Sequence, residues 1–223
     1  MKTLTKKTVP LFVLFVCLAF LWPHSGRASA ITDDLKTAIN KVIAIMQNPA
    51  FAAAEKKSER DKLIHSVVKE KFDWEEISKR ALGVHWRGLS PAQQKQFAEI
   101  FDDFLERTYI SKVNLFLKET RDFSSKNIFY LKETIDGQYA LIDSKIPLAD
   151  EEIPISYKLI NKDGKWVVYD LTIEGVGIVA NYRTQFNELL SNGSFETLIE
   201  KLKSKQGEAI IEKAPAPGEP KKQ

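Results

Sequence analysis

Hydrophobic and polar positions follow two different periods along this chain, and the period changes near residue 122. Before that point, apolar residues recur every three to four positions, the spacing of an α-helix with one buried face. After it, apolar residues recur at every second position, as in the strands of a half-buried antiparallel sheet. The pattern therefore predicts helices first, then a sheet, and further helices at the end.

The first predicted helix has Thr32 as its N-cap and ends at Asn48-Pro49, and a second, more polar helix is expected over residues 52–71. The apolar stripe of the first helix consists of Leu35, Ala38, Ile39, Val42, Ile43 and Met46.

Two capping boxes predict the next helix starts. Asp73 and Glu76 open a short helix that ends at Gly83, and Ser90 with Gln93 opens the longest helix of the chain. The longest helix carries the apolar positions Phe97, Ile100, Phe101, Phe104, Leu105, Tyr109, Val113 and Phe116.

Four strands with two hairpin turns are predicted next, followed by helices over residues 176–190 and up to Lys203. The strands cover residues 127–133, 138–146, 153–161 and 165–173. One apolar face is expected to hold Ile153, Ile155, Tyr157 and Leu159 of the third strand, and Val167, Tyr169, Leu171 and Ile173 of the fourth.

These elements predict an α+β fold in which helices pack over one face of a curved antiparallel sheet of about four strands. A curved sheet covered by amphipathic helices is a common way to enclose an apolar cavity. A filled core and a hollow one produce the same pattern, so both interpretations stay open at this point.

The ends of the chain differ from this domain. Residues 1–30 combine a basic start, an apolar run over residues 9–22 and small residues at 28–30, the order of a cleaved secretory signal. The run is shorter than the about 20 residues that a membrane span needs, although an uncleaved anchor is the alternative. We expect one exported domain over residues 31–206 and a disordered tail, rich in Pro, Glu and Lys, over residues 207–223.

Removal of the leader changes the charge and cysteine content. The leader holds four of the 33 Lys and Arg residues and no acid, which leaves 29 basic residues against 30 acidic ones. No basic excess points to a nucleic-acid partner. Cys17, the only cysteine, lies in the leader, so the domain has none for a disulfide, a thiolate nucleophile or a zinc site.

No catalytic or metal-binding motif is recognisable. Neither His65 nor His85 has a histidine four positions away on a helix or a carboxylate arranged as in an HExxH motif, and the glycines of residues 175–177 lack the lysine of a phosphate loop. Asp170 and Glu174 are candidates for a catalytic carboxylate pair, but a solvated or salt-bridged Asp170 is the preferred interpretation. We therefore expect no enzyme, no metal site and no cofactor.

Two segments resemble a known family. Residues 72–97 contain FDWEEISKRALG, HWR and LSPAQQ, and residues 170–186 contain DLTIEGV and NYRTQF. Together they resemble the toluene-tolerance/MlaC family of soluble periplasmic phospholipid carriers, over residues 34–203. Gly177 departs from the serine that family members often carry there, which puts a hydroxyl contact at the pocket mouth in doubt.

The resemblance implies a periplasmic lipid carrier that maintains outer-membrane lipid asymmetry. Such a protein holds phospholipid acyl chains between sheet and helices, and exchanges the lipid with an outer-membrane lipoprotein complex and with an inner-membrane substrate-binding subunit and its ABC transporter. The phospholipid is cargo rather than a cofactor, and we expect a monomer. A carrier of another lipid, such as a hopanoid, is the alternative.

The pocket is expected at the junction of sheet and helical lid, whereas Trp74 and Trp86 are expected as core anchors of the short helix. The lipid-binding residues predicted from the shared apolar faces are Tyr109, Val113, Phe116, Tyr157, Leu159, Tyr169, Leu171, Val176, Val179 and Tyr182.

Overall fold

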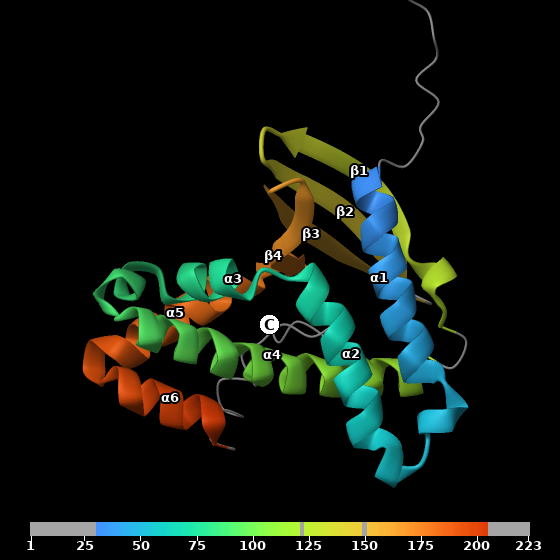
Figure 1. The fold of residues 1–223 in the computed structure, drawn as a ribbon. Helices are drawn as coiled ribbons and strands as arrows, with labels where there is room; N and C mark the ends of the chain where they lie inside the picture. Colours follow the sequence, from blue (N-terminus) through green and yellow to red (C-terminus); the bar gives the residue numbers. More distant parts are fainter. Residues whose placement is uncertain (1–29, 121–122, 149–150, 205–223) are drawn as a thin grey trace, which may run out of the picture.

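A computed structural model describes residues 30–120, 123–148 and 151–204 of the chain (Figure 1). The predicted tail lies outside these residues, as does the predicted signal peptide apart from Ala30. The helices are α1 (Ala30–Gln47), α2 (Lys57–Lys71), α3 (Trp74–Leu82), α4 (Pro91–Glu119), α5 (Ile178–Asn192) and α6 (Phe195–Lys203). The strands are β1 (Phe129–Asp136), β2 (Tyr139–Pro147), β3 (Glu152–Lys162), β4 (Lys165–Ile173) and β5 (Val176–Gly177).

The five strands form one open antiparallel sheet in the order β1-β2-β3-β4-β5. The predicted α+β fold is confirmed, with one strand more than expected. The extra strand, β5, exists because Glu174 and Gly175 both take a positive φ, which turns the chain back so that Val176 pairs with Ile173. Only glycine adopts this conformation without steric cost, which explains Gly175 at the turn.

The predicted apolar face of β4 is wrong in its first half because of a bulge. Asp170 pairs with Lys158, but the next pair joins Val168 to Leu159, so Tyr169 is an extra residue in its strand. A bulge of this kind shifts the alternation of side chains by one position. Val168 therefore lies on the buried face with Leu171, whereas Val167 and Tyr169 do not.

Capping residues in the sequence predicted most helix ends correctly. The Asp73 carboxylate accepts the Glu76 N–H at 3.1 Å, the Ser90 hydroxyl accepts the Gln93 N–H at 3.3 Å, and Gly83 ends α3 with φ of +56°. The Thr32 prediction is wrong, because α1 already begins at Ala30. Instead, the Thr32 N–H donates to the Glu133 carboxylate on β1 at 3.1 Å.

The start of the second helix also differs from the prediction. Two short 3₁₀ turns, Pro49–Phe51 and Ala54–Lys56, precede α2, which begins at Lys57. Among the described residues, no helix is both long enough and apolar enough to cross a membrane.

The helices divide into two groups around the long helix α4. In Figure 1 the sheet forms the upper layer and α4 runs beneath it, with α1 and α2 at one side and α3, α5 and α6 at the opposite end. α1 packs against α2, while α3 contacts both α4 and α5, and α6 contacts α4.

A solid aromatic cluster holds the end of the molecule formed by α4 and α5. Its ring centroids lie 5.1–6.3 Å apart, and each side chain is at most 2% exposed. Offset and edge-on contacts at such distances are the favourable geometries for aromatic rings. The aromatic cluster consists of Phe97, Phe101 and Phe104 from α4 and Tyr182 and Phe186 from α5.

Candidate functional site

A cavity of about 320 Å³ lies between the buried face of the sheet and the helices at the other end of α4. Helices α1 and α2, the start of α3, the second half of α4 and the start of α5 contribute to its wall. Its volume falls within the range of about 300–1,000 Å³ that is usual for small-molecule sites. The interior of this fold is therefore solid at one end and hollow at the other.

The helical wall is built from regularly spaced apolar positions. The whole stripe of α1, from Leu35 to Met46, lines the cavity, and Ile64, Val67 and Val68 of α2 continue it. On α4, lining residues recur every three to four positions, which keeps them on one face. The α4 wall consists of Leu105, Glu106, Tyr109, Ile110, Val113, Phe116 and Leu117.

The sheet wall comes from the buried faces of its three central strands. Ile146 of β2, Ile155 and Tyr157 of β3, and Leu171 and Ile173 of β4 line the cavity. Ile155 pairs directly with Ile173, and Tyr157 pairs with Leu171, so the register places these side chains next to one another. The result is a continuous apolar floor.

The three charged residues in the wall all have protein partners. Lys71 pairs with Asp34, Glu106 with His65, and Asp170 with Lys158. A buried charge needs such a partner, because burial without one is strongly unfavourable. Each charged group of the wall therefore has a polar partner within the protein, which favours an apolar ligand over an ionic one.

The tyrosines of the wall are also uncharged at neutral pH. Burial raises the pKa of Tyr157 to about 12, although a hydrogen bond with Ser144 acts in the opposite direction. Burial likewise raises the pKa of Tyr109 above its usual range. Neither phenol can supply an anionic group to the cavity.

Six of the ten predicted lipid-binding residues line the cavity: Tyr109, Val113, Phe116, Tyr157, Leu171 and Val179. They come from α4, β3, β4 and α5, which the fold brings together from segments far apart in the sequence.

The other four predicted residues lie elsewhere. Tyr182 is fully buried in the aromatic cluster, and Leu159 pairs with Val168 in the core, beyond the end of the cavity floor on β3. Val176 lies in the short edge strand β5 and is 43% exposed.

Tyr169 is displaced from the cavity by the bulge in β4. Its ring lies 6.0 Å from that of Tyr139, and the Arg80 guanidinium is 4.3 Å from its centroid. The hydrophobic pattern of β4 does not reveal the bulge, because apolar residues occupy both phases of this strand.

The predicted site omitted the contribution of α1 and α2. The stripe of α1 was visible in the sequence, but it predicts only a buried face and does not show what covers it. Trp74 was expected as a core anchor, yet it lines the cavity and stacks on Phe72 with centroids 5.5 Å apart. Trp86 is buried in the core, as expected.

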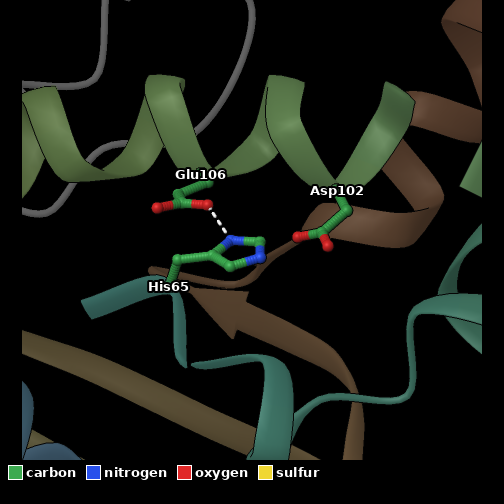
Figure 2. Close-up of side chains that lie close together, drawn as sticks. All are labelled: His65, Asp102 and Glu106. Atoms are coloured by element: carbon green, nitrogen blue, oxygen red, sulfur yellow. Dashed lines mark hydrogen bonds and ion pairs between the residues drawn. The ribbon is translucent and has the colours of Figure 1, made fainter. Parts of the chain in front are cut away.

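A second group of polar side chains lies behind the cavity wall, between α2 and α4 (Figure 2). His65 Nδ1 bonds to the Glu106 carboxylate, and Asp102 lies one turn before Glu106 on α4. Burial raises the pKa of Asp102 to about 6. The sequence pattern did not reveal this group, because the histidine and the acids belong to different helices.

Asp170 joins the sheet to α5. It is 7% exposed, its Oδ2 pairs with Lys158 Nζ at 2.8 Å, and its Oδ1 accepts the Val179 N–H at 3.1 Å. The preferred interpretation as a salt-bridged acid is confirmed, and the carboxylate also caps the first turn of α5.

Replacing Asp170 with alanine is therefore expected to lower the free energy of unfolding by about 2–4 kcal/mol, through loss of a cap and of a buried ion pair. Urea denaturation followed by circular dichroism measures the change. The matched control is Asp103→Ala on the exposed side of α4, which should change stability little. Equal effects of the two substitutions would contradict the role of Asp170.

Comparisons with known proteins agree with this architecture. Residues 36–204 match the protein family described as "MlaC protein". The intermembrane phospholipid transport system binding protein MlaC of Haemophilus influenzae is 24% identical over 136 residues, which cover 59% of this chain and 61% of that relative.

A solved structure shares the fold. The phospholipid-binding protein from Ralstonia solanacearum, solved in complex with a phospholipid, superimposes with a TM-score of 0.67 at 23% identity, and the match covers 82% of this chain and 99% of that one. Since the family match extends over most of the chain, including α4, the sheet and the closing helices, this protein belongs to the MlaC family.

Proposed function

We propose that this protein is a phospholipid carrier that holds the acyl chains of its cargo in the cavity between α1, α2, α4 and the sheet. The observation that carries the proposal is the hollow, apolar interior, whose charged wall residues are all paired within the protein. Membership of the MlaC family and the likeness to a lipid-bound protein support the choice of ligand.

The energetics favour enclosure of the acyl chains. Burial of one methylene away from water is favourable by about 0.8 kcal/mol. Transfer of two acyl chains of roughly fifteen methylenes each into water would therefore cost on the order of 24 kcal/mol of free energy. An apolar cavity offsets this loss for each methylene that it encloses, which stabilises the bound lipid relative to lipid in water. The direction of transport then depends on the relative affinities of donor and acceptor partners.

We place the carrier in the periplasm, exported through residues 1–30, as a monomer that needs no cofactor and catalyses no reaction. It exchanges lipid with an inner-membrane substrate-binding subunit and its ABC transporter, and with an outer-membrane lipoprotein complex. This assignment rests on the family and on the leader-like sequence. Fractionation of cells that express the full chain should release the protein with the periplasmic contents, shortened at its N-terminus.

Native mass spectrometry of the exported, purified protein tests the cargo. We expect one phospholipid per chain, identified by its mass after extraction, and uptake of phospholipid from vesicles by delipidated protein. A hopanoid mass would change the identity of the cargo while keeping the carrier function. A clean apo mass together with no uptake from vesicles would overturn the proposal.

A further inference from the structure

The polar group behind the cavity wall has the composition of a metal site. Asp102 and Glu106 stand one turn apart on α4, and His65 of α2 lies between their carboxylates (Figure 2). One potential ligand atom from each residue lies within 4.8 Å of the others. Spacing of i and i+4 on a helix directs both carboxylates to the same face.

Asp102 provides a second, independent observation. It is only 7% exposed, and its buried Oδ1 has no hydrogen-bond partner among the described residues. Figure 2 shows its carboxylate directed toward the imidazole of His65. A buried carboxylate oxygen without a partner is unfavourable, and a bound cation would provide the missing partner.

The donor set indicates which class of cation fits. Two carboxylates attract a divalent ion, and the imidazole nitrogen beside them favours a first-row transition metal over Mg²⁺ or Ca²⁺. Zinc bonds to nitrogen and oxygen measure about 2.0–2.2 Å, so ligand atoms around one ion lie within about 4 Å of one another.

The group is also accessible from solvent. A surface hollow beside it is lined by Lys57, Ser58, Asp61, Lys62, His65, Asp103 and Glu106. An ion can therefore reach His65 and Glu106 without passing through the apolar cavity. Glu106 belongs to both walls, which places the group directly between the hollow and the cavity.

We propose that His65, Asp102 and Glu106 form a binding site for one divalent transition-metal ion of the zinc class, which ties α2 to α4 beside the cavity. The proposal does not require a bound lipid, although Glu106 contributes both to this site and to the cavity wall. Two waters or the second carboxylate oxygens would complete the coordination sphere.

Titration calorimetry of the purified exported protein, treated with chelator and then dialysed, tests this site with Zn²⁺ alone. We expect one Zn²⁺ per chain, an affinity at least about tenfold weaker in Asp102→Asn, and no comparable heat with Mg²⁺. The matched control is Asp103→Asn, the neighbouring acid that lines the hollow outside the cluster, which should bind Zn²⁺ like the wild type.

Thermal unfolding with and without Zn²⁺ gives a second readout, because an ion that binds the folded state raises its midpoint. The midpoint should rise in the wild type and in Asp103→Asn, but not in Asp102→Asn or His65→Gln. Absence of Zn²⁺ binding, equal binding by Asp102→Asn and wild type, or an equal loss in Asp103→Asn would each overturn the proposal and leave His65 as a simple hydrogen-bonded link to Glu106.

Discussion

Replacing Val113 with tryptophan is expected to reduce the co-purified phospholipid about tenfold or more, since each 1.4 kcal/mol of lost binding energy is a factor of ten. Val113 lies in the α4 wall of the cavity, where an indole would occupy space that we assign to the acyl chains. Overpacking of an apolar interior typically destabilises a protein by about 1–3 kcal/mol. Release of the acyl chains from the cavity would remove this strain, so the variant should favour the lipid-free state. Native mass spectrometry and lipid extraction measure the bound fraction.

Leu115→Trp is the matched control for this experiment. Leu115 lies two residues further along α4 and is 59% exposed, so the same substitution there adds bulk outside the cavity. It should leave the bound phospholipid unchanged. Circular dichroism of both variants confirms that the fold is retained. If Val113→Trp carries as much phospholipid as the wild type, the acyl chains do not occupy this cavity.

The elements of this fold were largely predictable because their signals are local. A capping box such as Asp73 with Glu76, or a glycine with positive φ such as Gly83, acts within one turn of the chain. The strands were likewise visible from alternation and from their hairpin turns. The predictions were wrong where contacts with a distant segment determine the local structure. Thr32, for example, contacts Glu133 of β1.

The cavity could be predicted only in part, because hollowness is a property of several elements together. Tyr109 and Tyr182 both occupy apolar positions of amphipathic helices, yet one lines the cavity and the other is enclosed by phenylalanine rings. No single-helix pattern separates these outcomes. The bulge at Tyr169 is a second reason why the cavity was predicted only in part. The pairing of β4 with β3 determines which side chains of β4 lie on the buried face of the sheet.

The position of α4 between the two halves of the interior explains how a hollow protein keeps its shape. Its first half is fixed by close ring contacts with α5, and its second half can therefore present Tyr109 and Val113 to the cavity without filling it. A cavity costs stability because its wall atoms lack neighbours. The aromatic cluster, whose side chains are at most 2% exposed, offsets this loss.

Replacing Phe101 with alanine in this cluster is therefore expected to lower the free energy of unfolding by about 3–5 kcal/mol, as for other fully buried phenylalanines. Phe101 is fully buried, and its ring lies 5.1 Å from that of Phe186 and 5.3 Å from that of Tyr182. Phe129→Ala on β1, where the side chain is 50% exposed, should cost much less. Urea denaturation of the delipidated proteins separates this packing from stabilisation by bound lipid. Similar losses for both variants would mean that the aromatic cluster does not hold α4 against α5.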